Sequence, residues 1–383
     1  MSTGANSTPG ADAQRSARYI YIACPWTPVG GGMFKVADYL IQAQSPITGP
    51  GFAELRPLDT RGGSRAIYSI WVLASALGKL VRGRVGGRLA GVHVNMAERL
   101  SLFRKGLVVV VAHALGLPVV LHLHAAQLHH FYRALPRPLQ WLTRWMFSLP
   151  RACIVLGLEA KRFVTQELKV PADKVQIVIN GVPEPTVARR RARESGKQRV
   201  LFLGNLSERK GVSDLLRALA LPGFLRERLE VSIAGGGDIK SYQGQAERLG
   251  IDDFVRFEGW VDQNKAAYLL ANADVLTLPS YDEGLPLVIL EALANGVAVV
   301  CTPVGEIPGV LTDGVDACFV HAGDANSVAE GLQKVLDQPG LRELLERNGR
   351  LVYERHFSLG GFFASVARIH RQQFGICGQP RAP

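Results

Sequence analysis

Residues 278–296, LPSYDEGLPLVILEALANG, combine a turn, a helix start and two glutamates. An apolar run ends at Leu278, Glu283 follows in a turn, and Pro286 suits the first position of a helix. Such a turn places free backbone N–H groups and the positive end of a helix dipole at the carboxyl edge of a sheet, where α/β folds bind phosphates. The carboxylates of Glu283 and Glu291 can then hold hydroxyl groups of a ligand. The alternative is an ordinary helix start with two surface carboxylates.

Two further segments are suited to phosphate. In LFLGNLSERKGVSDLL, Arg209 and Lys210 follow a short apolar run, and a cation there would offset charge that develops on a leaving phosphate. Nearer the N-terminus, RYIYIAC is followed by PWTPVGGG, where the missing Cβ of Gly32 would let the backbone approach a phosphate closely. Taken alone, a Lys–Gly pair more often marks a solvated loop, and such glycines a flexible turn.

The run LHLHAAQLHH carries a histidine, His124, at the end of a predicted strand. A neutral imidazole at this edge can donate to a ligand oxygen or position a second substrate. A histidine on an apolar strand is usually a satisfied core residue, and we assign no function to His122, His129 or His130. A metal site is disfavoured, because no carboxylate or cysteine stands near the run.

Alternating apolar runs and helical periods surround these residues. Strands are predicted at residues 18–24, 91–94, 119–124, 153–156, 199–203, 229–234, 255–257, 274–278 and 298–301. Helices are predicted at residues 33–41, 66–81, 102–115 and 359–374. Two βα arrays on either side of a charged stretch predict an α/β protein with two doubly wound domains.

The length of 383 residues fits two domains of ordinary size. The start is small and polar without an apolar core, so we expect a disordered tail and no signal peptide. The expected parts are a tail at 1–17, an N-terminal domain at 18–186, a linker at 187–198, a C-terminal domain at 199–355, and a helix that packs back on the N-terminal domain with a short tail at 356–383.

The composition, 47% hydrophobic and 20% charged, is that of a globular protein. A net charge of +11 favours an anionic partner, whether nucleic acid, a membrane face or a phosphorylated small molecule. The five cysteines form no CxxC pair, which disfavours disulfides and zinc and favours a reducing compartment. No apolar run is long enough to predict a membrane-spanning helix.

The phrase EGLP…EALANG, with its Glu-x7-Glu spacing, resembles the retaining glycosyltransferases of family 4. The resemblance covers most of the chain and implies the GT-B fold, two Rossmann-like domains facing a central cleft. It implies that Glu283 orients a donor sugar, that Glu291 holds a ribose, and that Lys210 stabilises the leaving diphosphate. Further donor-binding positions implied by the matching motifs are Gly32, Asn205, Arg209, Val261, Gly284 and Leu285, and His124 would contact the donor sugar.

Three positions depart from the family pattern. Asn205 stands where many members have an arginine, and Ala125 follows His124 where glycine or threonine is usual. The phrase GEIPG, residues 305–309, stands where the family often has GGIPE, so Glu306 takes the place of a glycine and Gly309 the place of a glutamate. The phrase NGV, residues 180–182, matches the family's exit from the first domain, and we expect a structural role for it.

The resemblance implies transfer of a hexose from GDP-mannose or a UDP-hexose to a hydroxyl, with retention of configuration. We expect no metal or other cofactor, because basic residues and backbone amides would neutralise the diphosphate. Domain closure over the donor is expected.

Aromatic and basic residues interleave at 131–151, where Trp141 and Trp145 stand among arginines, and an apolar stretch at 66–88 adjoins four basic residues. This mixture suits the interface of an anionic bilayer, although a core helix with snorkelling arginines would look similar. We therefore expect a lipid-linked saccharide acceptor and a cytoplasmic protein held peripherally at the inner membrane face. The phrase HVNMAERLSLFRKG, residues 93–106, resembles family members that build exopolysaccharide repeat units on polyprenyl diphosphate, which implies a role in polysaccharide biosynthesis.

Three other functions compete with this interpretation. A sugar-nucleotide epimerase on the same fold needs no acceptor surface. A dinucleotide-dependent oxidoreductase would show GxGxxG followed by an acidic residue, and GGGMFK lacks that spacing. A nucleic-acid-binding protein would fit the charge but would need a recognisable basic motif, and we find none.

Overall fold

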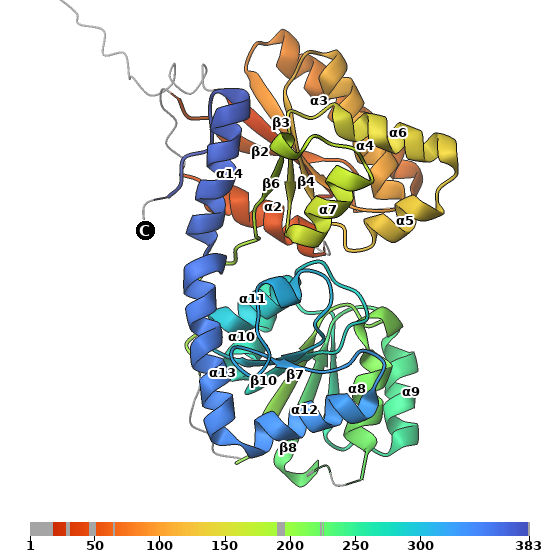
Figure 1. Ribbon diagram of the computed structural model, residues 1–383, viewed down its shortest axis with the longest axis vertical. Coiled ribbons are helices and arrows are strands. Elements are labelled where there is room, and N and C mark those ends of the chain that lie inside the picture. The colour runs from red at the N-terminus through yellow and green to blue at the C-terminus, as the bar shows by residue number, and fades with distance from the viewer. Residues whose placement is uncertain are drawn as a thin grey trace, which may run out of the picture. The chain divides into compact units, whose positions relative to one another are not determined.

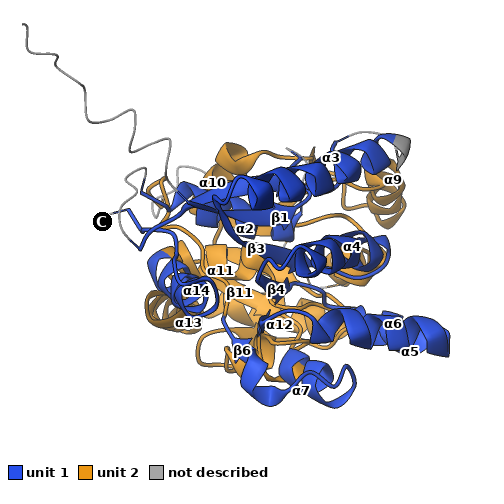
Figure 2. Cartoon of the chain, turned by 90° about the horizontal axis from the view of Figure 1, so that it is seen from above, with its two compact units in different colours: residues 1–156, 160–178, 360–383 blue, residues 157–159, 179–359 orange. Residues whose placement is uncertain are grey.

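The structure is a computed structural model that describes residues 18–27, 31–45, 51–63, 66–189, 196–222, 224 and 226–381. The predicted disordered tail and residues 190–195 of the predicted linker lie outside the described residues. The chain forms two compact units, coloured separately in Figure 2. Unit 1 comprises Met1–Leu156, Ala160–Val178 and Gly360–Pro383, and unit 2 comprises Gly157–Glu159 and Ile179–Leu359.

Unit 1 holds a six-stranded parallel sheet in the order β2-β1-β3-β4-β5-β6 (Figure 1). Its strands are β1 Tyr19–Cys24, β2 Glu54–Asp59, β3 Leu89–Met96, β4 Val119–Leu123, β5 Ala152–Val155 and β6 Val175–Ile177. Its helices are α2 Gly32–Gln42, α3 Ala66–Val85, α4 Leu100–Ala114, α5 Leu128–Ala134, α6 Arg137–Ser148, α7 Leu158–Gln166 and α14 Leu359–Phe374. The first two residues of α7 and the first residue of α14 belong to unit 2. Every residue of β3, β4 and β5 is buried, as expected for a parallel sheet covered on both faces.

Unit 2 repeats the architecture with a parallel sheet in the order β12-β11-β10-β7-β8-β9. Its strands are β7 Gln198–Leu203, β8 Leu229–Ala234, β9 Val255–Gly259, β10 Val275–Leu278, β11 Ala298–Cys301 and β12 Cys318–Phe319. Its helices are α8 Val212–Ala220, α9 Ile239–Leu249, α10 Gln263–Asn272, α11 Leu287–Ala294, α12 Ala325–Asp337 and α13 Pro339–Val352, and the π-helical turn η5 Tyr353–Phe357 follows α13.

The strand orders fix where each sheet changes winding direction. In unit 2 the first strand, β7, lies beside the fourth, β10, which is the 3-2-1-4-5-6 order of dinucleotide-binding folds. In unit 1 the reversal falls between β1 and β3, as in flavodoxin-like sheets. Ligands of open α/β sheets bind outside the carboxyl ends of the strands at such reversal points.

Three strands were not predicted, namely β2, β6 and β12. Each lies at an edge of its sheet and is only partly buried. The β2 sequence ELRPLD contains charged residues and Pro57, which an edge strand tolerates. Sequence reasoning missed these strands because it searched for continuous apolar runs, and edge strands do not need them.

Helix α14 belongs to unit 1, where it packs on β3. The Nε2 atom of His370 lies 2.8 Å from Nδ1 of His93, and a Cβ atom on Gly91 would come within 2.6 Å of the Phe374 ring. In Figures 1 and 2, α14 lies on the opposite side of the sheet from α3, α4 and α6. The chain enters unit 2 after Val178 and returns at Gly360, compared with the expected boundaries at 186 and 356.

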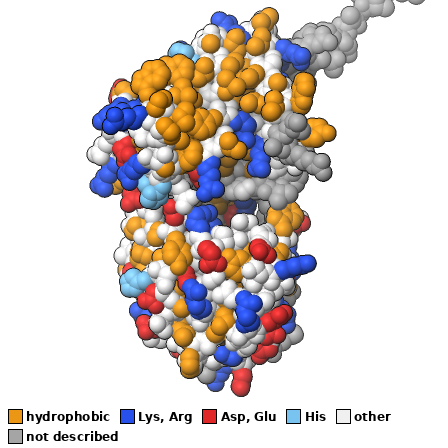
Figure 3. Space-filling model, turned by 90° about the vertical axis from the view of Figure 1, so that its right-hand side faces the viewer, with side chains coloured by type: hydrophobic (Ala, Val, Ile, Leu, Met, Phe, Trp, Pro, Cys, Tyr) orange, Lys and Arg blue, Asp and Glu red, His pale blue; other side chains and the backbone are white. Residues whose placement is uncertain are grey.

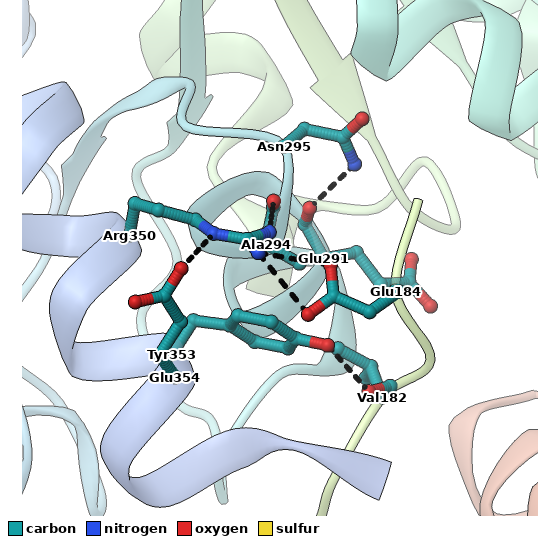
Figure 4. Close-up of polar contacts among 8 residues, drawn as sticks. All are labelled: Val182, Glu184, Glu291, Ala294, Asn295, Arg350, Tyr353 and Glu354. Carbon is teal, nitrogen blue, oxygen red and sulfur yellow. Dashed lines mark hydrogen bonds and ion pairs between the residues drawn. The ribbon is translucent and has the colours of Figure 1, made fainter. Parts of the chain in front are cut away.

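The segment that enters unit 2 is held by a polar network, drawn in Figure 4. Arg350 donates from Nη2 to Glu184 Oε2 at 2.9 Å, from Nε to Glu354 Oε1 at 2.8 Å, and from Nη1 to the carbonyl of Ala294. The hydroxyl of Tyr353 donates to the carbonyl of Val182 at 3.2 Å. These contacts fasten the NGV phrase to α13 and η5, and they are consistent with the structural role expected for it.

Candidate active site in unit 2

The reversal point of the unit 2 sheet brings a lysine and a glutamate into direct contact. Lys210 follows β7, Glu283 follows β10, and Lys210 Nζ donates to Glu283 Oε1. The side chains are 13% and 8% exposed. Arg209 Nη1 lies 3.8 Å from Glu283 Oε2 and donates to the carbonyl of Asp282 at 2.5 Å. Two cations and one nearly buried carboxylate thus meet where an α/β sheet binds phosphates.

Two glycines permit the close loop packing that forms this contact. A Cβ on Gly211, where φ is +70°, would lie 2.0 Å from the carbonyl oxygen of Pro279. A Cβ on Gly305, where φ is +59°, would lie 1.8 Å from the carbonyl oxygen of Glu283. Only glycine tolerates both the positive φ and the contact. The missing side chains of these glycines therefore let the loops after β7 and β11 each lie against the loop after β10.

Helix α11 begins directly after this loop. Pro286 is its N-cap and Leu287 its first residue. The proline was predicted at the first helical position and lies one position earlier. Pro286 makes no side-chain cap, and the first turn of α11 contains no acidic residue. The first N–H groups of a helix lack intrahelical acceptors, so this end can receive an anion. Gly284 and the buried Leu285 lie in the loop just before it.

Glu291, the second glutamate of the motif, lies in the second turn of α11 and is 8% exposed. Its carbonyl accepts a hydrogen bond from Nδ2 of Asn295 at 2.8 Å (Figure 4). Both motif glutamates are therefore nearly buried, which argues against two ordinary surface carboxylates.

A glycine-rich turn after β8 forms another part of this edge. The N–H of Leu206 donates to the carbonyl of Gly236 at 2.7 Å, so this turn packs against the residues that follow β7. A Cβ on Gly236 would lie 3.6 Å from Oδ1 of Asn205 and 3.9 Å from Cδ1 of Trp260. Trp260 is 52% exposed, and the next residue, Val261, is partly buried. Asn205 and Val261 were predicted from the sequence, whereas Trp260 was not. The sequence feature that could have indicated Trp260 is a large aromatic residue directly after a glycine in FEGWV.

Glu306, one of the departures from the family pattern, has a partner. Its Oε2 accepts from the backbone N–H of Glu159, a residue of the same unit, at 3.4 Å. A Cβ on Gly157 would lie 2.0 Å from that oxygen, so Gly157 leaves the space that the Glu306 carboxylate occupies. The carboxylate thus has a packing role that the sequence did not reveal.

The two predicted site residues of unit 1 lie at the carboxyl edge of its own sheet. Gly32 is the first residue of α2 and is exposed, and residues 28–30 before it lie outside the described residues. His124 follows β4, and its Nε2 donates to Oδ1 of Asn95 at 2.9 Å. Burial, with nearby positive charge on His93 and Lys105, holds the pKa of His124 well below its usual value. A neutral His124 whose Nε2 proton is donated to Asn95 offers Nδ1 as an acceptor, so it would accept from a ligand hydroxyl, whereas the sequence suggested a donor.

His122 belongs to a buried array of rings. Its Nδ1 lies 3.2 Å from Nε2 of His93, and His93 in turn contacts His370. All three side chains are fully buried, and burial lowers the pKa of each, to about 4 for His93. These histidines are core residues of unit 1, as expected for His122. Among the described residues, no three His, Cys, Asp or Glu side chains could hold a metal ion together.

A cavity of about 930 Å³ lies elsewhere in unit 2, beside Arg189, Asp274 and Arg350. Asp274 precedes β10, so the cavity opens at the amino edge of the sheet, away from the Lys210–Glu283 pair. Its arginines bind protein groups, as in the pair of Arg189 with Glu346 at 2.7 Å. We therefore place the candidate site at the carboxyl edge.

Comparison with known proteins identifies the second half of the chain. Residues 184–352 match the family described as glycosyl transferases group 1. The chain contains a group 1 glycosyltransferase domain. The matched residues include Lys210, Glu283 and Glu291.

Relatives of the chain carry related names. A Methanocaldococcus jannaschii protein named an uncharacterized glycosyltransferase is 31% identical over 218 residues, which covers 53% of this chain and 55% of that protein. The D-inositol 3-phosphate glycosyltransferase of Streptomyces griseus subsp. griseus is 35% identical over 185 residues, covering 46% and 35%. The chain thus matches about half or less of the length of these relatives.

Solved structures match across both units. The sucrose-phosphate synthase of Thermosynechococcus elongatus has a TM-score of 0.74 at 17% identity, covering 94% of this chain and 99% of that chain. Anabaena HepE in complex with UDP and glucose has a TM-score of 0.71 at 16% identity, covering 92% and 99%. WaaG, a glycosyltransferase involved in lipopolysaccharide biosynthesis, has a TM-score of 0.68 at 18% identity, covering 91% and 99%. These likenesses confirm the predicted GT-B fold with its two doubly wound domains.

Proposed function

We propose that this protein is a retaining glycosyltransferase of family 4 that transfers a hexose from a nucleotide-diphosphate sugar to a hydroxyl of a saccharide acceptor. The observation that carries the proposal is the Lys210–Glu283 pair at the reversal point of a group 1 domain. It places a cation, a carboxylate and an uncapped helix start around one point at the edge of the sheet.

In this proposal the donor diphosphate lies between Lys210 and the start of α11. When the sugar–phosphate bond breaks, negative charge grows on the leaving diphosphate, and Lys210, Arg209 and the N–H groups at the start of α11 stabilise it. Glu283 then has two tasks: it holds Lys210 extended before the donor arrives, and it accepts from donor sugar hydroxyls afterwards. The carboxylate of Glu291 would hold the ribose, and Asn205 and Val261 would line the nucleotide side.

The same arrangement supports a reaction without a metal ion. Two cations and a helix start face the proposed diphosphate position, so the protein itself supplies the counter-charge that a divalent ion supplies elsewhere. We propose that no cofactor beyond the nucleotide sugar is required. A UDP-hexose and GDP-mannose both remain in this proposal, and the HepE structure with UDP and glucose supports the uridine nucleotide.

The test is a transfer assay with a panel of radiolabelled UDP-hexoses and GDP-mannose, offered to a bacterial membrane lipid extract and to soluble saccharides. We expect one donor to label an acceptor, and Glu283→Gln to abolish the transfer. Conversion of the donor into a different free sugar nucleotide, with no labelled acceptor, would refute the transferase and support an epimerase.

The finer part of the proposal concerns a membrane. In unit 1, α4 packs between α3 and α6, and the three helices expose large apolar side chains. They include Tyr68, Ile70 and Trp71 of α3, Leu107 of α4, and Trp141 and Trp145 of α6. Figure 3 shows hydrophobic and basic side chains side by side on one face of this unit. Trp71 is 74% and Trp141 67% exposed, so these residues are not core residues with snorkelling arginines beside them.

We propose that this face binds the anionic inner leaflet of the cytoplasmic membrane and that the acceptor is a lipid-linked saccharide of polysaccharide biosynthesis. Exposed tryptophans and arginines favour an anionic interface, since the ring enters the headgroup region while the cation meets phosphate. No helix among the described residues is long and apolar enough to cross a membrane.

Flotation with anionic vesicles tests the membrane part separately. We expect Trp141→Ala with Trp145→Ala to lose most vesicle binding, while Trp260→Ala, which removes an exposed tryptophan from unit 2, keeps it. Equal binding by both variants would refute this surface and leave the transferase proposal standing.

A further inference from the structure

A fully buried lysine in unit 1 has no carboxylate hydrogen-bond partner among the described residues. Lys105 lies on α4 with an exposed fraction of 0%. Within the described residues its Nζ has one polar partner, the thioether sulfur of Met33 at 2.9 Å, and a thioether is a weak acceptor. Burial lowers the pKa of Lys105 to about 7, Arg104 lowers it further, and Cys24 and Glu98 oppose the change. A buried ammonium is costly without a counter-charge, so this position calls for an anion.

Further donors without partners share the same end of α4. Ser101, Arg104 and Lys105 stand at i, i+3 and i+4 and therefore on one face of the helix. The Oγ of Ser101 and the Nε of Arg104 are buried, and neither has a hydrogen-bond partner within the described residues. Arg99 is the N-cap, with φ at +60° and no side-chain cap, and the first turn holds no acidic residue. The start of α4 is thus uncapped, cationic and rich in donors.

The ends of β2 and β3 carry two more such atoms. Oγ1 of Thr60, just after β2, and Nδ2 of Asn95, at the end of β3, are buried and without a partner in the part of the chain that the structure describes. Asn95 is already bonded to His124 through its other side-chain atom. These residues lie where the unit 1 sheet reverses between β1 and β3, which is the ligand position that its topology selects.

We propose that Lys105, Arg104, Ser101 and Asn95 form a phosphate-binding subsite in unit 1. The unpartnered groups of this set can all donate, and none is a carboxylate, so the ligand must be a negatively charged acceptor of hydrogen bonds. The donors come from two different elements, α4 and the end of β3, which suits a tetrahedral group with three outer oxygens better than a planar carboxylate. In this proposal the phosphate belongs to the saccharide acceptor, because unit 2 carries its own cations for the donor diphosphate. The identity of the ligand as acceptor rests on the proposed function, whereas the subsite itself does not.

The subsite is tested by calorimetric titration with inorganic phosphate after the chain has been saturated with UDP. We expect the wild-type chain to bind one further phosphate. Lys105→Met, which keeps the length of the side chain and removes its charge, should weaken that binding about tenfold or more, since a charge-assisted contact is lost. Arg104→Gln should weaken it less, and Arg248→Met, which removes an exposed cation of α9 in unit 2, should leave it unchanged.

The outcomes separate the two proposals. Normal UDP binding without any further phosphate site, or phosphate binding that Lys105→Met does not alter, would overturn the subsite and leave the proposed function intact. Failure to bind both UDP and GDP, with the phosphate site present, would overturn the proposed function alone. A thermal melt of Lys105→Met checks that the variant is folded. If it is not, the phosphate affinity of Arg104→Gln tests the subsite instead.

The source of the phosphate is decided by competition. Glucose 6-phosphate represents a soluble acceptor, and neutral phospholipid vesicles carrying a polyprenyl monophosphate represent a lipid-linked one. Displacement of inorganic phosphate by one of them, lost in Lys105→Met, would support an acceptor phosphate and identify its source. If neither displaces phosphate, the assignment to the acceptor is wrong.

Discussion

The carboxyl edges of the two sheets hold their cations in opposite ways. In unit 2, Lys210 is already paired with Glu283, and Arg209 lies near the same carboxylate. In unit 1, Lys105 is more deeply buried. Within the described residues its Nζ has only the Met33 thioether as a polar partner, and Ser101 Oγ and Asn95 Nδ2 have none. Both units have six parallel strands and a reversal point, so the fold does not cause this difference.

The difference indicates two ways of preparing a phosphate site. A paired cation is held in place without ligand, and binding exchanges one negative partner for another. An unpaired buried cation is destabilising until an anion arrives, so ligand binding should stabilise unit 1 more than unit 2. The expected effects below test this contrast, beginning with the largest.

Removal of the paired cation should have the largest effect on activity. Lys210→Met removes the charge that faces the leaving diphosphate and leaves Glu283 unpaired, so we expect transfer to fall roughly 100- to 1000-fold in kcat. The control is Arg248→Met, which removes an exposed cation of α9 in the same unit and should act like the wild type. A Lys210→Met enzyme with unchanged kcat would show that the pair is structural only.

The packing of the two loops in unit 2 can be broken at one glycine. Gly211→Ala would place Cβ against the carbonyl of Pro279, and we expect it to destabilise the unit by about 3 kcal/mol or more. Gly314→Ala is a matched control, because Gly314 has nearly the same φ, +69°, and no atom within 4 Å of its added Cβ. It should cost about 1 kcal/mol, the backbone strain alone. Urea unfolding of both variants measures the difference, and equal losses would contradict the role of loop contact.

The buried histidines should make unit 1 the more acid-sensitive unit. The pKa of His93 is about 4 in the fold and near 6.5 when unfolded, so the unfolded chain binds the proton first as the pH falls. Stability is therefore fully present above about pH 6.5 and is lost between 6.5 and 4, by about 2 kcal/mol at pH 5 for His93 alone. The described histidines of unit 2, His321 and His356, are exposed.

Hydrogen exchange across this pH range can resolve the two units. We expect the amides of β3 and β4 to lose protection below pH 6.5 before those of β10 and β11. His370→Gln should shift that loss, since it changes the ring that contacts His93. Simultaneous loss in both units would argue that the array does not control acid stability.

The smallest expected effect concerns ion pairs. Arg350→Met removes the hydrogen bonds to Glu184, Glu354 and the Ala294 carbonyl from a side chain that is 32% exposed, and we expect a loss of about 1–2 kcal/mol in unit 2. Arg133→Met breaks the more exposed pair with Glu167 in unit 1 and should cost less, because solvent screens that pair. Denaturant midpoints of the two variants decide the order, and a larger loss for Arg133→Met would reverse it.

Much of the fold was predictable because buried parallel strands leave continuous apolar runs. The runs around residues 119–124 and 298–301 correspond to β4 and β11. The edge strand β2 escaped, since its charged residues and Pro57 satisfy no such pattern. At the candidate site, the EGLP phrase singled out Glu283, but no local pattern showed that its partner would be Lys210, 73 positions away.

The sequence alone determined the α/β class, the two βα arrays and the segments that carry Lys210, Glu283 and Glu291, because periodicity and loop composition are local properties of the chain. Only the tertiary structure decided which charges are paired. The register of β7 beside β10 brings Lys210 to Glu283, whereas α4 buries Lys105 with no carboxylate in hydrogen-bond contact among the described residues. Pairing depends on distances between segments far apart in the chain, and only the folded sheet sets them.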